Sequence, residues 1–143
     1  MNALAFCLEV AQAQARLRRK LDDELGTWHG VSFEDFVLLS ALDQAQGGRL
    51  TVAGLARPLG IQPSSVLRVV LALEKTGLVQ RETDSAGRRW VVLRKPGRQL
   101  LGEAAENAEA ICRKALVPLA PEMVAAASSC LAALAGSAAL ELR

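Results

Sequence analysis

The sequence has few of the side chains on which metal and catalytic chemistry usually depend. It contains one histidine, three cysteines and no tyrosine among 143 residues. The cysteines, Cys7, Cys112 and Cys130, share no metal-type spacing, and their odd number predicts no disulfide framework. Each lies among apolar neighbours on an expected helix, where a small buried thiol is the usual outcome. We therefore expect no metal and no cofactor.

The sequence also lacks motifs of enzymes and of membrane or exported proteins. It has no nucleophile elbow, no phosphate-binding glycine loop and no acidic cluster at catalytic spacing, so an enzyme is the weakest functional class. The apolar stretch 123–134 is alanine-rich and carries two serines and a cysteine, which is too weakly hydrophobic for a membrane span. The first ten residues carry no basic group ahead of their apolar residues, unlike a signal peptide. We expect a cytoplasmic protein.

Alanine and leucine are abundant and aromatic residues make up only 3%, which favours a mainly α-helical protein. Apolar residues at helical intervals predict a long first helix from Ala3 to about Gly26, where Gly26, Thr27 and Gly30 interrupt the pattern. Ser32, with Asp35 three residues later, forms a capping-box start for a second helix. A fifth helix is expected after Pro96-Gly97, and a sixth from Glu122 to near the C-terminus.

The middle of the sequence predicts a helix-turn-helix followed by a β-hairpin. Thr51 is suited to cap a third helix over 52–59, and Gly60 to end it. Pro63 suits the first turn of a fourth helix over 63–76, after a link of about three residues that includes a glycine. Two β-prone runs, 78–83 and 88–93, are separated by the four-residue turn Asp84-Ser85-Ala86-Gly87.

Basic residues are concentrated in this middle segment. Residues 49–98 hold ten of the seventeen lysines and arginines against three acidic residues, a net charge of +7. The remaining residues hold seven basic and twelve acidic side chains, a net charge of −5. Clustered lysine and arginine release counterions from a phosphate backbone, so this block indicates nucleic-acid binding. The plainer alternative is a solvated charged face.

The order of these elements resembles the MarR family of bacterial winged helix-turn-helix regulators. The matching residues are Leu55-Ala56, Leu59-Gly60-Ile61, Pro63-Ser64-Ser65-Val66, Arg68, the run from Leu73 to Val79, Arg81, Asp84 and Arg88-Arg89. The segment Leu93-Arg94-Lys95-Pro96-Gly97-Arg98 stands where the family has a leucine-threonine and a glycine before the next helix. The flanking helices fit in length and position, so the resemblance covers nearly the whole chain.

The fourth helix is the expected recognition helix. With Val66 at the centre of the buried face, Val69, Val70 and Leu73 join it, and the residues that point outward are Ser64, Arg68, Leu71 and Lys75. The best candidates for base contacts are Gln62, Ser64, Ser65 and, above all, Arg68, whose guanidinium can chelate a guanine edge. Lys75 adds a further DNA-binding side chain. Ser64 and Ser65 are otherwise ordinary helix-start residues.

The hairpin is the expected wing. Arg88 and Arg89 resemble the wing arginines that contact the minor groove or its phosphates, and arginine suits that narrow, electronegative groove. Alternatively, either arginine pairs with Asp84 and braces the hairpin. The sequence departs from the family here, because Gly87 stands where a second aspartate is usual and the hairpin is about two residues short.

Leu67, Leu71 and Ala72 also depart from the family, because polar or charged residues are common at these positions. An outward Leu71 needs a partner, which is a thymine methyl group, a neighbouring element or another protein. The last possibility defines the rival function, a winged-helix protein interaction module that uses the Leu67/Leu71 surface. The +7 block favours DNA, since a protein-binding module has no need of it.

The resemblance also implies a homodimer and a small aromatic effector. The first, fifth and sixth helices form the dimer in the family, and the leucines available for it here are Leu4, Leu8, Leu116, Leu119, Leu131 and Leu134. Trp28 and His29 are the candidate ligand-binding residues, the more ordinary alternative being a packed tryptophan and a surface histidine. Cys7 stands on the first helix like the sensing cysteine of the hydroperoxide-responsive branch, but no tyrosine is present to partner its oxidised form.

These features predict a mainly α winged helix-turn-helix protein flanked by long terminal helices. Residues 1–30 and 97–143 form the expected helical dimerisation region, and residues 31–96 the DNA-binding region. The expected function is a dimeric, sequence-specific transcriptional regulator, a repressor relieved by a small ligand. Its expected partner is double-stranded DNA, in the form of a palindromic operator.

Overall fold

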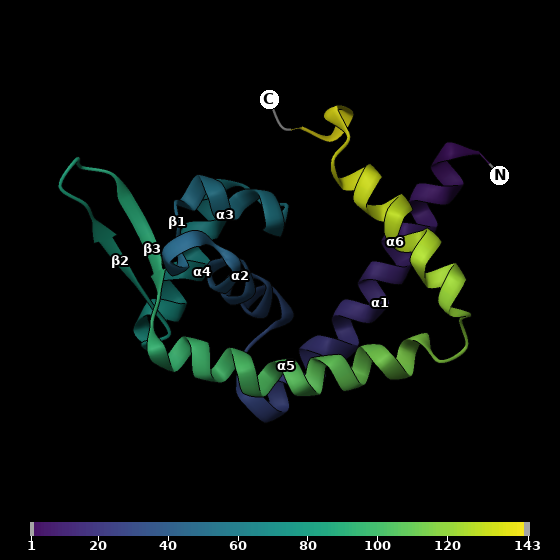
Figure 1. The fold of residues 1–143 in the computed structure, drawn as a ribbon, viewed down its shortest axis with the longest axis horizontal. Coiled ribbons are helices and arrows are strands. Elements are labelled where there is room, and N and C mark those ends of the chain that lie inside the picture. The colour runs from purple at the N-terminus through teal and green to yellow at the C-terminus, as the bar shows by residue number, and fades with distance from the viewer. Residues whose placement is uncertain (1, 142–143) are drawn as a thin grey trace. The chain divides into compact units, whose positions relative to one another are not determined.

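The computed structural model describes residues 2–141, and its elements follow the order expected of a winged helix-turn-helix (Figure 1). The chain divides into two compact units, one up to Ala108 and one from Glu109 onward. The helices are α1 (Ala3–His29), α2 (Phe33–Gln44), α3 (Val52–Leu59), α4 (Pro63–Lys75), α5 (Lys95–Leu116) and α6 (Pro121–Ala135). The strands are β1 (Arg49–Leu50), β2 (Val79–Thr83) and β3 (Arg89–Leu93), and two short 3-10 turns occupy Gln46–Gly48 and Ala138–Leu140.

Helix α1 continues past the point where the sequence predicted its end. It runs through Gly26 and Thr27 and stops at Gly30, whose φ of 71° closes the helix with bonds from its N–H to the carbonyls of Gly26 and Leu25. A glycine inside a helix costs about 1 kcal/mol relative to alanine, which a buried face offsets. Leu21 and Leu25 supply that face, at 1% and 0% exposure.

Helix α2 begins as predicted. The Ser32 hydroxyl accepts the backbone N–H of Asp35, and the Asp35 carboxylate accepts that of Ser32, which completes the capping box. Asp22 of α1 accepts the N–H of Phe33 at 2.7 Å and fixes the turn between the two helices. The core of the first unit forms where α2, α3 and α4 meet, and its fully buried side chains include Leu38, Leu39, Leu42, Leu55, Val66 and Val70.

The sheet has three antiparallel strands in the order β1-β3-β2, and β2 and β3 project from the helices as a ribbon (Figure 1). In the hairpin Val79 pairs with Leu93 and Thr83 with Arg89, which confirms the predicted wing. Strand β1 was not predicted, because two residues are too few for a periodicity to show. It pairs Leu50 with Val91 and so joins the start of the helix-turn-helix to the wing.

Helix α5 begins at Lys95, before Pro96-Gly97, whereas the sequence predicted a start after them. Proline is tolerated in the first turn of a helix, where its missing N–H has no partner in any case. Gly97 is buried against the base of the wing. The backbone carbonyl of Leu78 and the side chain of Leu93 leave no space there for a Cβ atom. The helix can approach the base of the wing this closely only with glycine at this position.

The unit from Glu109 onward consists of the end of α5 and α6. Helix α6 is confirmed, although it ends at Ala135 and a 3-10 turn follows. None of its residues is buried. The expectation of buried thiols was wrong for Cys7 and Cys130, which are exposed, while Cys112 is half-buried. The neighbours of Cys7 and Cys130 on their helices include several alanines, which are too small to enclose a thiol.

No single helix among residues 2–141 is both long and apolar enough to span a membrane, and only α5 and α6, taken together as a bent pair, pass by length and composition. The compact units divide the chain at a different place from the predicted regions 1–30, 31–96 and 97–143. Those regions were defined by function rather than by compactness, so they stay a prediction. Residues 1, 142 and 143 of the predicted dimerisation region lie outside the described residues.

Candidate nucleic-acid interface

Helix α4 is held by its buried face and by two glycines. Gly60 closes α3 with a φ of 65°, and Pro63 then starts α4 in its first turn. Gly77, with a φ of 79°, allows the chain to turn from α4 into the hairpin. Val66, Val70 and Leu73 are buried as predicted, and Val69 is half-buried.

The opposite face of α4 is exposed and mostly polar or basic. The predicted outward residues Ser64, Arg68, Leu71 and Lys75 are all exposed, and so is Gln62, which precedes the helix. Ser65 is half-buried, and its backbone N–H donates to the carbonyl of Gln62 at 2.9 Å. Of the five contact residues predicted here, the structure therefore exposes four, which are Gln62, Ser64, Arg68 and Lys75, and leaves Ser65 half-buried.

Glu74 joins the end of α4 to the wing. Its carboxylate accepts the Arg81 backbone N–H at 3.1 Å and receives hydrogen bonds from the Arg81 guanidinium at 3.0 to 3.2 Å. The Arg81 side-chain bonds are the main cause that lowers the pKa of Glu74 below its usual value. Because its guanidinium is already paired, Arg81 serves the geometry of the wing more than the binding of phosphate.

Asp84 organises the turn of the wing. Its Oδ1 accepts the backbone N–H groups of Ala86 and Arg88, at 3.0 and 2.9 Å, and its Oδ2 accepts the indole N–H of Trp90 at 3.0 Å. The Trp90 bond is the largest of the causes that lower the pKa of Asp84. The predicted alternative was that the side chain of Arg88 or Arg89 pairs with Asp84. For Arg88 the structure shows a different contact, because Asp84 accepts its backbone N–H.

The guanidinium of Arg88 lies instead over the ring of Trp90, 4.7 Å from the ring centroid. Arg49 of β1 lies over the same ring at 4.2 Å. Sequence reasoning missed both Trp90 and Arg49. One signal was available, because Arg88 and Trp90 are two residues apart and therefore face the same side of a strand. Arg49 gave no signal, because only the pairing of β1 with β3 brings it there.

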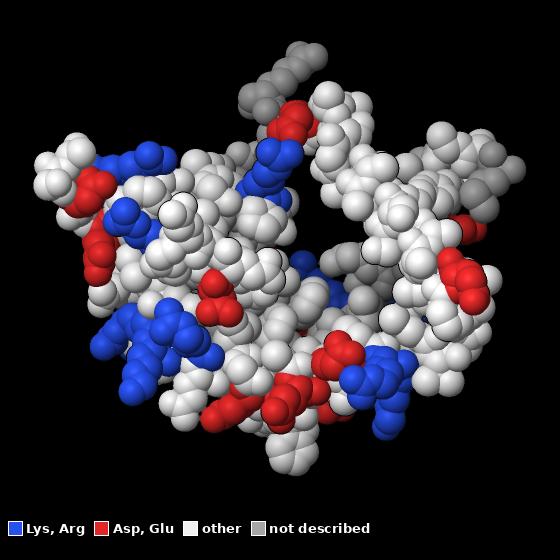
Figure 2. Space-filling view, viewed as in Figure 1, with Lys and Arg blue, Asp and Glu red and all other residues white. Residues whose placement is uncertain are grey.

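Besides Arg49 and Arg88, the basic side chains of the 49–98 block include some with a polar partner and some with none among the described residues. Arg81 pairs with Glu74, Arg98 lies 3.5 Å from Asp43, and Arg94 donates to the carbonyl of Gly77. By contrast, Arg68, Lys75 and Arg89 are exposed and make no ion pair within residues 2–141. Figure 2 shows basic side chains gathered at the first turns of α5, side chains of both signs on the hairpin, and acidic ones along the middle of α5.

A groove of about 840 Å³ separates α4 from the hairpin. One wall carries Ser64 and Leu67 from the N-terminal half of α4, and the other carries Arg89 and Trp90 from β3. Arg89, the second predicted wing residue, thus faces the recognition helix across an open channel. Its position gives the surface two cationic edges, one on the helix and one on the wing.

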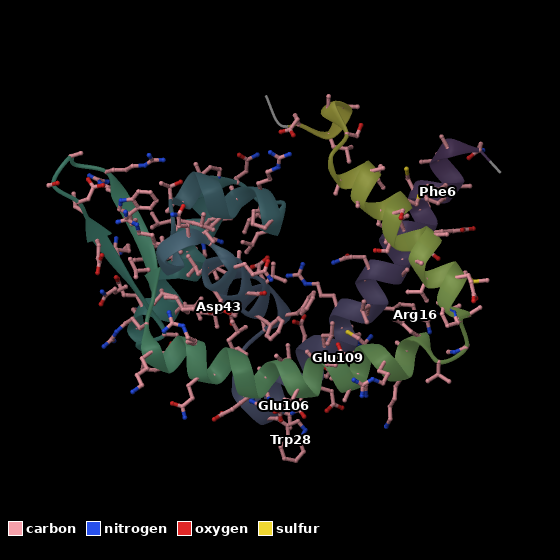
Figure 3. All side chains as sticks on the ribbon, viewed as in Figure 1. Phe6, Arg16, Trp28, Asp43, Glu106 and Glu109 are labelled. Carbon is pink, nitrogen blue, oxygen red and sulfur yellow. The ribbon has the colours of Figure 1, made fainter. Side chains whose placement is uncertain are left out.

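The structure separates the side chains of the predicted ligand-binding pair. Trp28 is 68% exposed and points away from the protein (Figure 3), while His29 is half-buried, with its Nε2 2.9 Å from the Asn107 side-chain nitrogen on α5. The alternative of a packed tryptophan and a surface histidine was therefore wrong. His29 faces inward because α1 continues three residues beyond Gly26, which rotates it toward α5.

The fold and the exposed recognition face define a winged helix-turn-helix DNA-binding protein. A family model described as MarR family matches residues 29–89. A comparison of the sequence with curated proteins finds no match.

Three solved structures illustrate the similarity over the whole fold. Sco3205, a MarR family transcriptional regulator from Streptomyces coelicolor solved in complex with DNA, is 25% identical, with 94% of this chain and 88% of that chain covered and a TM-score of 0.83. The transcriptional regulator BldR from Sulfolobus solfataricus is 25% identical, with 92% and 99% covered and a TM-score of 0.74. CouR from Rhodococcus jostii RHA1, solved with p-coumaroyl-CoA, is 20% identical, with 96% and 98% covered and a TM-score of 0.82.

The chain is therefore similar to the MarR family, by the family model over residues 29–89 and by its fold over nearly the whole length. Members of this family are transcriptional regulators and not enzymes. The resemblance inferred from the order of Thr51 to Arg81 is thereby confirmed, as are the winged-helix fold and the class of DNA-binding regulator.

Proposed function

We propose that this protein is a homodimeric repressor that binds a palindromic operator and releases it when a small ligand binds. The observation that carries the proposal is the exposed face of α4, where Arg68 and Lys75 make no ion pair within the described residues, beside a wing that bears Arg89. Unpaired cations on a recognition helix and a wing are complementary to the phosphates on either side of a major groove.

The roles that we assign to the arginines differ. Arg68 projects from the middle of the outward face and is suited to chelate a guanine edge, with Gln62, Ser64 and Ser65 beside it. Lys75, Arg88 and Arg89 supply charge to the backbone or the minor groove. Arg88 does so while resting on Trp90, so the ring fixes the direction of its guanidinium.

A homodimer is supported by apolar side chains that neither unit covers. On α1, Leu4 and Leu8 are 68% and 53% exposed. In the unit from Glu109 onward, the exposed apolar residues are Leu116, Val117, Leu119, Met123, Leu131 and Leu140. Exposed apolar side chains in this number are typical of protein interfaces. In the proposed dimer, residues 1–30 and 97–143 hold the protomers together, and residues 31–96 bind DNA.

Ligand control is supported by relatives. CouR was solved with p-coumaroyl-CoA, and 6-hydroxynicotinic acid regulates DNA binding by BpsR of Bordetella bronchiseptica, 23% identical. Of Trp28 and His29, our candidates for contact with a small aromatic ligand, the inward-facing His29 fits that role, whereas Trp28 points away from the protein. The hydrogen bond between Asn107 and His29 connects this site to α5, and the first turn of α5 packs on the wing. A ligand that moves His29 would therefore act on the wing through α5.

The test is a titration of fluorescent duplex DNA, enriched from a random pool by the protein itself, at several salt concentrations. If two protomers neutralise about six to ten phosphates, affinity should fall about 10³- to 10⁵-fold between 50 and 200 mM salt. An enriched palindrome would support the dimer. Absence of binding at low salt would overturn the proposal and favour the rival, a protein interaction module built on Leu67 and Leu71.

Variants separate the arginine roles in the same titration. Arg68→Ala should cost about 1 to 3 kcal/mol on the enriched duplex and relax base preference at one position of each half-site. The double change Arg88→Ala and Arg89→Ala should weaken binding to every sequence and lower the salt slope, because those residues contribute charge. A uniform loss on all sequences with Arg68→Ala would show that Arg68 binds only phosphate.

A further inference from the structure

Leu67 and Leu71, here called the apolar pair, lie one helical turn apart on α4, and each is 38% exposed. The core does not need them, because Val66 and Val70 are 0% exposed and Leu73 is 4% exposed on the buried side of the same helix. Around the helix, Leu67 and Leu71 lie on the same side of the proposed base-reading Arg68, at about 100° and 60° from it.

The exposed side chains next to the apolar pair include polar and cationic ones on α4 and on the facing strand. Arg68 and Lys75 lie beside it on α4, and Leu67 faces Arg89 across the groove between α4 and the hairpin. Ser64 lies one turn before Leu67 on the same side of the helix. Two leucines beside cations that make no ion pair within residues 2–141 are complementary to an apolar group that lies between phosphates.

Duplex DNA offers one such group in the major groove, the 5-methyl group of thymine. From these positions we infer that Leu67 and Leu71 read thymine methyl groups in each half-site, next to the base pair that Arg68 contacts. They are specificity-determining residues that select thymine over cytosine by burial of the methyl group. The inference rests on the proposed function, since it requires α4 to enter the major groove.

The size of the effect follows from the area that is buried. Burial of one methyl group contributes about 0.8 kcal/mol, which corresponds to about a four-fold change in affinity. In a palindrome each contact occurs twice, so loss of one symmetric pair of methyl groups should weaken binding about 10- to 20-fold. Such a loss is readily measured by titration.

The experiment replaces thymine with deoxyuridine, one symmetric pair at a time, in the duplex that the protein enriches from random DNA. Deoxyuridine lacks only the methyl group and keeps the same hydrogen-bonding edge. We expect the intact protein to lose about 10- to 20-fold affinity at one or two positions and little elsewhere. Leu67→Ala or Leu71→Ala should bind the thymine duplex more weakly and lose the sensitivity at the corresponding position.

Lys75→Ala is the matched control on the same exposed face. It should reduce the salt slope and keep the full sensitivity to deoxyuridine, because a phosphate contact does not depend on the methyl group. Circular dichroism of each variant checks that the helices are retained. If Leu71→Ala fails this check, Leu71→Gln is a second substitution at the same exposed position.

Three outcomes would overturn the inference. The intact protein could bind the duplex equally well with deoxyuridine at every position, or both leucine variants could keep the sensitivity to it. The leucine variants could also bind DNA as tightly as the intact protein, which would leave the apolar pair to a protein partner. All three leave the proposed function intact, whereas failure to bind any duplex at low salt contradicts the proposed function itself.

Discussion

Asp84 binds three N–H groups of the wing with one carboxylate, and the Trp90 indole is the contact that most lowers its pKa. These bonds therefore stabilise the wing at pH values above 3.8, the ordinary pKa of an aspartate. The stabilisation is lost as the pH falls through the lower pKa that Asp84 has in the folded protein. We predict that the Trp90 indole N–H resonance shifts with a midpoint below pH 3.8.

Nuclear magnetic resonance of the labelled indoles measures this directly. Trp28 is 68% exposed and serves as an internal reference in the same spectrum. Asp84→Asn should abolish the shift of Trp90, because an amide does not titrate. A midpoint at or above the ordinary value, or an equal shift of both indoles, would contradict the role that we assign to Asp84.

Single residues of the site were predictable only where one element places them. The outward positions of Ser64, Arg68 and Lys75 follow from helical periodicity within α4 alone, and the structure agrees. The contact of Arg49 with Trp90 depends on the pairing of β1 with β3, across 41 positions of sequence, and no local pattern encodes it. Side chains whose partners come from distant strands therefore escaped the sequence reading.

Elements were predicted well where capping residues mark their ends. Thr51 and Gly60 fixed the bounds of α3, and both caps are present in the structure. The sequence reading placed the end of α1 at Gly26 because glycine is a poor helix former, but burial of Leu25 and the cap at Gly30 extend the helix. Two errors, at the end of α1 and the start of α5, thus arise where tertiary packing outweighs local propensity.

Two glycines on α5 allow the effect of packing to be separated from that of propensity. A Cβ atom at Gly97 would overlap the carbonyl of Leu78 and approach Leu93 Cδ1 to 2.8 Å, whereas one at Gly102 meets nothing within 4 Å. We predict that Gly97→Ala destabilises the protein by about 1 to 3 kcal/mol, since backbone must shift. Gly102→Ala should stabilise it by about 0.5 to 1 kcal/mol.

Urea denaturation at one fixed protein concentration compares the two variants, because the concentration affects the stability of any dimer. Both variants make the same glycine-to-alanine change in the same helix. The difference between their unfolding midpoints therefore reports the contact between α5 and the wing. Equal midpoints for the two variants would mean that Gly97 does not lie against Leu78 in solution. Weaker DNA binding by Gly97→Ala is expected as well, since the same contact seats the hairpin.

At the scale of the whole molecule, charge and apolar surface are segregated along the chain. The block 49–98 carries a net charge of +7 and the rest −5. The uncovered leucines lie outside that block, apart from Leu67 and Leu71. Charge separation was evident from the sequence because it needs only counting. The extent of exposed apolar surface was not evident from the sequence, because it depends on which faces of the helices are covered by other parts of the protein.

This segregation leads to the prediction that the terminal helices form an obligate homodimer. Leu131 of α6 is 48% exposed, and charge at that position should disrupt a packed interface. We predict that Leu131→Glu, or deletion of residues 122–143, yields monomers or insoluble protein at micromolar concentration. Tight operator binding should then be lost, because half-sites about one helical turn apart, roughly 34 Å, need two recognition helices held by a two-fold axis.

Analytical ultracentrifugation of the intact protein and of each variant measures the association. Ser129→Glu is the matched control, because it adds the same charge about 200° around α6 from Leu131 and replaces a side chain that is already polar and exposed. We expect it to remain dimeric. If the intact protein sediments as a stable monomer and still binds a palindrome tightly, dimerisation does not organise its recognition of DNA, and the exposed leucines of α1 and α6 need another explanation.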